Sequence, residues 1–180
     1  DEEGRMSAIT KSIFIFSTLL ILSSTPLVFS QVVPKPEDFL GFKVGADYHL
    51  ATYTQAIGYF KKLQENSKRI KLFDMGKTSM GQVMSYAVIS SEENMANLEK
   101  YKQLAKRLSL VKGLSDAEAE SLAQEGKAVV YIDGGLHAAE CAPAQQNIQL
   151  AYDLVAAKDP KVLRILNDVI LILVFANPDG

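Results

Sequence analysis

Seven consecutive apolar residues, Val169–Phe175, constrain the fold of this chain more than any other stretch of its sequence. A strand that is apolar at every position must be covered on both faces, as the strands of α/β proteins are. Residues 128–133 form an earlier apolar strand, and helical patterns lie between the two. Strands that alternate with helices predict an α/β fold with a mixed, mostly parallel sheet flanked by helices.

The other expected elements follow from local signals. Thr52 and Gln55 form a capping box, which predicts a helix that begins at the next residue. Two strand-like runs, 69–75 and 83–90, are joined by a loop with a Gly at each end, which favours a hairpin. Further helices are expected to begin after Ser90, Ser115 and Asp159. The apolar stripe of the helix after Ser90 is expected in the core: Met95, Leu98, Tyr101 and Leu108.

The chain divides into three expected segments. Residues 1–30 comprise upstream residues followed by a signal peptide, and residues 31–50 form an extended arm rich in Pro and Gly. Residues 51–180 form the folded domain. A strand buried on both faces should not be the last element of a finished domain, so we expect the domain to be truncated at Gly180.

The first segment has the parts of a secretory signal peptide. Met6 and Lys11 begin it, an apolar run covers 13–22, and Ser30 is a small residue at the expected cleavage position. The run is shorter than the roughly 20 apolar residues of a membrane span, although an uncleaved anchor stays an alternative. The sequence therefore predicts a secreted or periplasmic protein, cleaved after Ser30, with no stable membrane association after cleavage.

Charge and cysteine content exclude some partners and cross-links. The 19 Lys and Arg residues are dispersed among 21 Asp and Glu residues, and the net charge is −2, so nothing indicates nucleic-acid binding. Cys141 is the only cysteine, which excludes a disulfide within the chain. We expect Cys141 to be a small buried packing residue, with a redox-sensitive role as the alternative.

The strand at 128–133 is followed by residues whose side chains could bind a metal ion. Gly134 and Gly135 form a turn, and His137 and Glu140 follow it. One helical turn brings positions i and i+3 onto the same face, so this imidazole and carboxylate can converge on one metal ion. Zinc hydrolases use such a pair with one more ligand and an open position for water. The pattern indicates part of a zinc site.

The motifs of this sequence, and the order in which they follow one another, resemble those of the zinc metallocarboxypeptidase family of the carboxypeptidase A type. Its HxxE motif is similar to His137–Glu140 after the strand and Gly-Gly turn, and its NPDG turn matches residues 177–180. The hairpin around 76–90 is also similar, so the resemblance covers roughly 48–180. It implies that 51–180 is the N-terminal part of a zinc carboxypeptidase-like catalytic domain.

The resemblance also implies a reaction and its residues. His137 and Glu140 would hold Zn²⁺, which activates water to hydrolyse the C-terminal peptide bond of a peptide or protein substrate. No catalytic residue is expected within the chain, because the general-base Glu, the third ligand and the carboxylate-binding arginines would follow Gly180. The chain alone would then bind zinc poorly and catalyse nothing. Many members carry Arg where Ala139 stands and an aromatic residue where Cys141 stands, which leaves the substrate side-chain preference open.

Several alternatives remain open from the sequence. The same fold with zinc could serve an amidohydrolase or deacylase, or a non-catalytic peptide-binding pseudoenzyme. An inverted H-x-x-E-H site would make Glu140 a base, but Cys141 occupies its last position. Asp133 could orient a metal ligand, although capping the turn is the simpler role. His49 lies in the polar arm, and we expect no role for it in a site.

Overall fold

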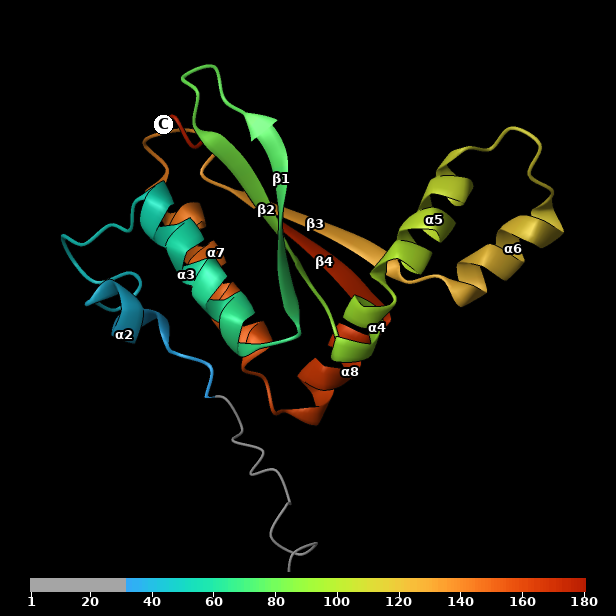
Figure 1. The fold of residues 1–180 in the computed structure, drawn as a ribbon, viewed down its shortest axis with the longest axis horizontal. Coiled ribbons are helices and arrows are strands. Elements are labelled where there is room, and N and C mark those ends of the chain that lie inside the picture. Colours follow the sequence, from blue (N-terminus) through green and yellow to red (C-terminus); the bar gives the residue numbers. More distant parts are fainter. Residues whose placement is uncertain (1–31) are drawn as a thin grey trace, which may run out of the picture. The chain divides into compact units, whose positions relative to one another are not determined.

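The computed structural model describes residues 32–180 (Figure 1). The predicted upstream residues and signal peptide lie outside the described residues. Within 32–180, none of the helices combines the length and the apolar character that crossing a membrane requires.

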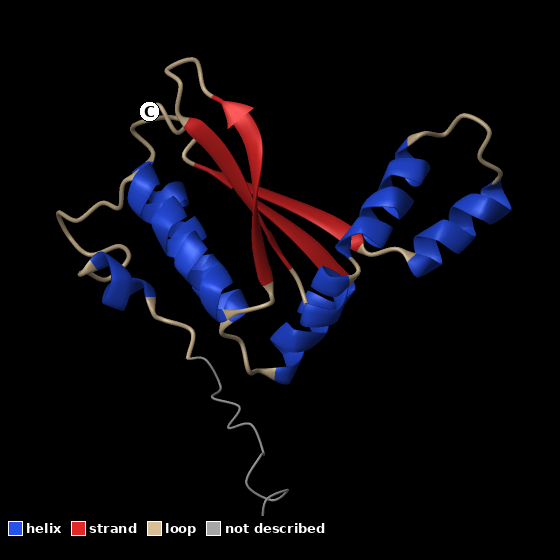
Figure 2. Ribbon diagram, in the orientation of Figure 1, coloured by secondary structure: helices blue, strands red, loops and turns tan. Residues whose placement is uncertain are grey.

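A four-stranded mixed sheet forms the centre of the described domain (Figure 2). Its strands are β1 (Ile70–Lys77), β2 (Val83–Ile89), β3 (Ala128–Gly134) and β4 (Val169–Phe175), in the order β1-β2-β4-β3. The predicted hairpin is confirmed, since β1 and β2 pair antiparallel.

The sheet is mixed as predicted, but parallel pairing does not dominate these four strands. Only β3 and β4 are parallel, whereas β2 pairs antiparallel with both β1 and β4. The short loop between β1 and β2 forces them to run in opposite directions, because a parallel pair needs a crossover of a dozen or more residues. The helices between β3 and β4 supply that crossover.

The parallel pair determines where the site lies. Gly134, the last residue of β3, is opposite Phe175, the last residue of β4. Parallel strands end at the same edge of a sheet, which is where ligand sites of open α/β sheets form. The loop at 135–140 and the turn at 176–180 therefore emerge side by side.

Two helices cover one face of the sheet. They are α3 (Tyr53–Asn66) and α7 (Cys141–Val155), which lie next to each other in Figure 1. The capping box predicted at Thr52 and Gln55 is present, with both reciprocal bonds made. Alternate strand residues face these helices, and the buried cluster includes Tyr59, Phe60, Leu63, Ile89, Ile148, Ala151, Leu171, Leu173 and Phe175. The large apolar side chains of this cluster, such as Leu63 and Phe175, each contribute about 1.5–3 kcal/mol through burial.

The sequence predicts that the arm is extended, but the structure shows that this is only partly so. A short helix, α2 (Pro36–Leu40), lies within it. Pro36 stands at the start of the helix, where a missing N–H costs nothing, and Gly41 ends it in the left-handed conformation at φ 81°. Pro36 and Gly41 were counted among the residues that suggested an extended segment, but here they start and end a helix.

The helix predicted after Ser90 is two helices, α4 (Glu92–Ala96) and α5 (Leu98–Ser109). The N-cap is Ser91, one residue later than predicted, and its hydroxyl accepts from the Asn94 backbone N–H. The Asn94 side chain is buried, and it donates to the carbonyls of Leu166 and Asn167 at the end of α8 (Pro160–Asp168). This anchor holds α4 against α8, while α5 leaves in a different direction.

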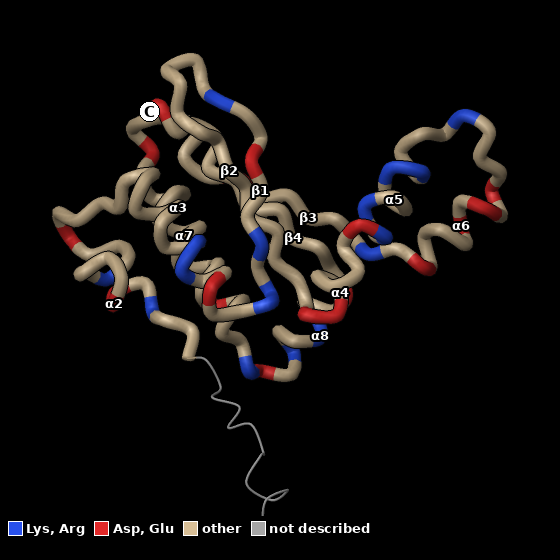
Figure 3. Tube along the Cα trace, in the orientation of Figure 1, with Lys and Arg blue, Asp and Glu red and all other residues tan. Residues whose placement is uncertain are grey.

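The α5 helix packs against α6 (Asp116–Glu125), and Figure 3 marks basic positions along α5 and acidic positions along α6. Lys100 Nζ lies 2.8 Å from Glu125 Oε1, and an Arg107 guanidinium nitrogen lies 3.1 Å from Glu118 Oε1. Gly126 follows α6 directly and ends it.

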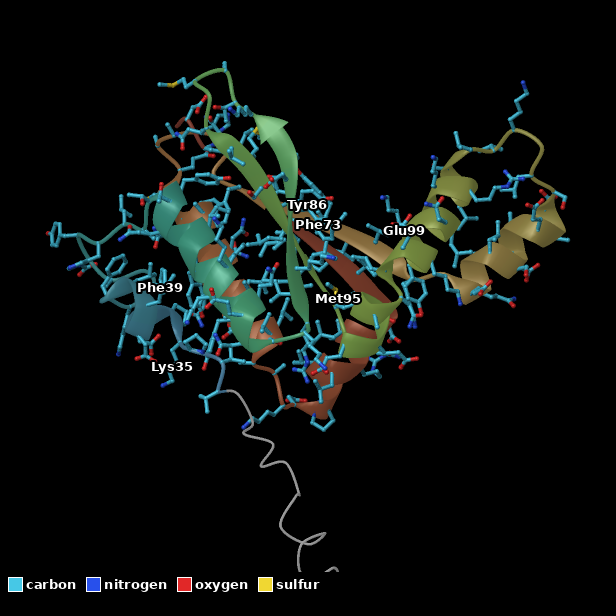
Figure 4. All side chains as sticks on the ribbon, viewed as in Figure 1. Lys35, Phe39, Phe73, Tyr86, Met95 and Glu99 are labelled. Carbon is cyan, nitrogen blue, oxygen red and sulfur yellow. The ribbon has the colours of Figure 1, made fainter. Side chains whose placement is uncertain are left out.

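The predicted core stripe on α4 and α5 is only half-buried, because the sheet lies on one side of it and leaves a groove. The groove has a volume of about 510 Å³, and Figure 4 shows Phe73, Tyr86, Met95 and Glu99 around it. The Phe73 and Tyr86 rings stack across β1 and β2 with their centroids 5.4 Å apart.

Candidate metal centre

The loop at 135–140 connects β3 to α7 and carries both predicted ligands. It begins at Gly135, whose φ of 70° suits glycine. Within it, the Glu140 backbone N–H donates to the His137 carbonyl over 3.0 Å. The two side chains therefore converge through a tight turn and not through a helix, because α7 begins only at Cys141.

The structure brings His137 and Glu140 together. His137 Nδ1 lies 2.9 Å from Glu140 Oε2. Both side chains are open to solvent, with exposed fractions of 70% and 56%. An imidazole nitrogen and a carboxylate oxygen thus face each other at the mouth of a pocket.

This pair fits part of a zinc site. Imidazole nitrogen and carboxylate oxygen are ligands that zinc takes at about 2.0–2.2 Å in tetrahedral sites, so two ligand atoms lie roughly 3.3 Å from each other. The observed 2.9 Å is within a few tenths of an ångström of that separation. Among residues 32–180, however, no group of three or more His, Cys, Asp or Glu residues forms a complete metal site.

His137 and Glu140 both line a pocket of about 350 Å³. Ile148 and Phe175 contribute apolar surface, and Leu50 of the arm and Thr52 at the start of α3 also line the pocket. Pockets that combine apolar walls with a few polar groups are typical of small-molecule and peptide sites.

The NPDG turn lies against the loop at 135–140. The Asn177 side-chain amide donates to the Leu136 carbonyl over 3.2 Å, and the Ala176 N–H donates to the Gly134 carbonyl over 3.0 Å. Gly180 packs so closely that a Cβ there would lie 3.2 Å from Ala138 Cα. The turn that the sequence singles out is thus part of the same structure as His137 and Glu140.

Other residues named from the sequence lie outside this arrangement. Asp133 is exposed and does not line the pocket. The His49 ring lies in the arm, where its Nδ1 is 2.8 Å from the Asp47 carbonyl oxygen. The prediction that Cys141 is buried is wrong: it is exposed at the first position of α7, on the rim of the pocket. The helix starts at the protein surface there, so no neighbouring element covers the thiol.

Two residues of the pocket were not apparent from the sequence. The Tyr53 hydroxyl donates to the Val83 carbonyl and accepts from the Ser85 N–H, which ties α3 to β2. Gln145 is buried in the pocket wall, and its side-chain carbonyl oxygen has no hydrogen-bond partner. Neither has a local signal, because each depends on contacts between segments far apart in the chain.

Two comparisons with known proteins gave matches, one to a family model and one to solved structures. The family model for zinc carboxypeptidases matches residues 57–180, which is more than half of the chain. No curated protein sequence matches. The crystal structure of the carboxypeptidase A from Helicoverpa armigera is similar, with a TM-score of 0.51 and 17% sequence identity.

That structural likeness covers 81% of this chain and 31% of the other, so the chain spans about a third of the length of this relative. At this identity the likeness shows the fold, and the family match carries the assignment. The chain belongs to the zinc carboxypeptidase family.

Proposed function

We propose that this chain contributes to a zinc metallocarboxypeptidase that hydrolyses C-terminal peptide bonds, with His137 and Glu140 as metal ligands. One observation carries the proposal. The family's HxxE pair meets at 2.9 Å on a pocket at the carboxyl edge of the parallel strands.

In this proposal some residues of the pocket would hold the metal ion and others would bind the peptide. Zinc in such sites supplies a water nucleophile at neutral pH and polarises the carbonyl under attack. His137 and Glu140 would hold the ion, and apolar groups such as Ile148 and Phe175 would pack against the peptide. The arm at Leu50 would limit how the peptide enters.

The remaining parts of the reaction are not assigned to this chain. A second nitrogen ligand, a general base and groups for the substrate carboxylate are required, and residues 32–180 hold no cluster that would complete the metal site. We therefore propose that these residues follow Gly180 in the active enzyme. Export by the signal peptide at 1–30 is part of the same proposal and rests on its sequence alone.

Metal binding by the chain tests the ligand assignment. The chain has only two His residues, so its imidazole NMR signals separate the candidate His137 from His49. Titration with Zn²⁺ should shift the His137 signals with a dissociation constant in the millimolar range and leave the His49 signals in place. His137→Ala should remove the response, and His49→Ala is the matched control that should retain it.

The role of Glu140 is tested in the same titration. Glu140→Gln should weaken zinc binding at His137, because the amide is a poorer ligand than the carboxylate. Unchanged zinc affinity in this variant would instead support a base role for Glu140, and equal shifts at both His residues would overturn the site. If the 180-residue chain bound zinc with sub-millimolar affinity and hydrolysed peptides, the proposal that the third ligand and the general base follow Gly180 would be wrong.

A further inference from the structure

We propose that Asn177 is a positioning residue for the metal-ligand loop, defined as residues 135–140. This inference rests on the proposed function, since it concerns how the ligands of that site are held. It assigns a role to the NPDG turn, which the sequence indicates only as a turn.

The ligand loop has little apolar burial to fix its position. Every residue from Leu136 to Glu140 is exposed. Because burial of apolar surface is the main source of stability, such a loop takes its position from individual hydrogen bonds and close contacts. Residues 176–180 supply such contacts, namely a side-chain hydrogen bond to the Leu136 carbonyl and a close approach to Ala138.

The Asn177 side chain makes the central contact. Its amide nitrogen donates to the Leu136 carbonyl, the residue immediately before His137. Gly180 N–H donates to the Asn177 carbonyl over 3.2 Å and closes the turn. A Cβ at Gly180 would lie 2.8 Å from the Asn177 amide nitrogen, so the amide is held between that glycine and the loop.

The turn can position the loop because it is itself held on its other side. The Gln82 side chain donates to the Pro178 carbonyl over 2.9 Å, and the Met80 N–H donates to Asp179 Oδ2 over 3.2 Å. Both partners belong to the loop between β1 and β2. The turn therefore bridges a hairpin on one side and the ligand loop on the other, and Asn177 supplies the side-chain bond to the ligand loop.

The far end of the ligand loop has a separate anchor. The Asn147 side chain in α7 donates to the Val174 carbonyl over 2.9 Å, which holds the helix after Glu140 against β4. Loss of the Asn177 bond should thus free the middle of the loop and leave the sheet and α7 in place. This separates a positioning role from a general structural one.

Two variants of Asn177 test the inference. Asn177→Ala removes the amide, and Asn177→Asp keeps the shape but has no N–H to donate. Asn97→Ala is the matched control, because the Asn97 side chain makes one comparable bond to the Glu93 carbonyl at an exposed helix end. Backbone ¹⁵N relaxation then reports the order of residues 136–140 without any metal.

In the wild-type chain we expect order parameters near about 0.85 in this loop, and in both Asn177 variants values toward about 0.6. The order of β4 should not change, and Asn97→Ala should leave the loop as it is. Zinc affinity at His137 should fall about tenfold in Asn177→Ala, as it does when outer hydrogen-bond partners of metal ligands are lost. The Asp variant is not used for zinc, because its charge would itself attract the ion.

The outcomes separate the inference from the proposed function. An ordered loop in both Asn177 variants, or zinc affinity in Asn177→Ala within twofold of wild type, would overturn the positioning role. Loss of order throughout the domain would show a structural role only and would overturn it as well. A wild-type chain that shows no zinc response at His137 would refute the ligand assignment, while the relaxation data would still decide whether Asn177 orders the loop.

Discussion

Gly134 is the residue at which the site's geometry leaves no room for a side chain. A Cβ there would lie 2.5 Å from the Pro143 carbonyl oxygen and 2.8 Å from the Asn147 amide nitrogen. Its φ lies outside the left-handed region, so the need for glycine comes from the close approach of β3 to α7. This contact brings the start of α7, and with it Glu140, close to the end of the strand.

We expect Gly134→Ala to destabilise the domain by about 1–3 kcal/mol, because the new methyl group meets backbone atoms that cannot move independently. Chemical denaturation measures the change. Gly58→Ala is the matched control: it lies in α3, where a Cβ would meet only the ring of Phe39 at 3.3 Å. Alanine also favours the helix by about 1 kcal/mol, so this variant should be nearly neutral. Similar losses in both variants would contradict the close-approach explanation.

Tyr59 is a second residue whose surroundings give a measurable consequence. It is fully buried, and its hydroxyl donates to the Pro34 carbonyl over 2.8 Å. Burial raises the pKa of Tyr59 well above its usual value of 10.0, with Tyr152 and Glu37 adding to the effect. Above that pH the unfolded chain loses this proton while the folded chain keeps it, so stability falls as pH rises.

Tyr59→Phe should therefore cost about 1 kcal/mol at neutral pH and make stability less sensitive to pH above 10.0. Urea denaturation on either side of that pH measures both effects. Tyr48→Phe, at a fully exposed site, should behave as wild type. If the free energy of unfolding fell with pH as steeply in Tyr59→Phe as in the wild type, groups other than Tyr59 would be responsible for the loss of stability at alkaline pH.

At the scale of elements, local capping signals predicted where several helices begin. Thr52, Ser115 and Asp159 each accept a hydrogen bond from the first turn of the helix that follows. These signals work because they involve only neighbouring residues. The division between α4 and α5 depends instead on Asn94 and its contacts with α8, some seventy residues away in the sequence, which no local pattern encodes.

Asn94→Ala should destabilise the domain by about 1–3 kcal/mol, because it removes buried bonds to the Leu166 and Asn167 carbonyls and to the Ser90 hydroxyl. Thermal unfolding measures the loss. Asn97→Ala, one turn farther along and exposed, should change stability by about 0.5 kcal/mol or less. An equally small effect of both would show that α4 does not depend on this anchor.

At the scale of the molecule, the sheet has an uncovered edge within residues 32–180. There β3 pairs only with β4, and Val129, Val130 and Tyr131 on β3 are exposed. Unpaired strand edges with apolar side chains tend to pair with other chains. The groove on the neighbouring face adds further apolar surface.

We expect the chain to self-associate as its concentration rises, and Tyr131→Lys to reduce this, because a charge on an edge strand opposes pairing. Light scattering over a concentration series measures the effect. Tyr48→Lys makes the same substitution at an exposed site away from any strand, so it should leave association unchanged. Equal effects of the two variants would show that general surface charge, and not the strand edge, controls association.

The sequence alone determined the elements whose signals are local. The apolar run at Val169–Phe175, the strand before Gly134, the hairpin and the HxxE spacing all depend on residues that are neighbours in the chain, and the structure has each of them. These features were sufficient to indicate the α/β fold and the zinc carboxypeptidase family. They were not sufficient to predict that His137 and Glu140 converge through a turn.

Only the tertiary structure decided how the loop at 135–140 is held. Asn177 reaches Leu136 across 41 positions of sequence, and Gln82 reaches Pro178 across 96. The tertiary structure likewise left Cys141 exposed, where its residue type had suggested burial. Such contacts depend on which strands are neighbours in the sheet, and a strand's own sequence specifies its faces but not its neighbours.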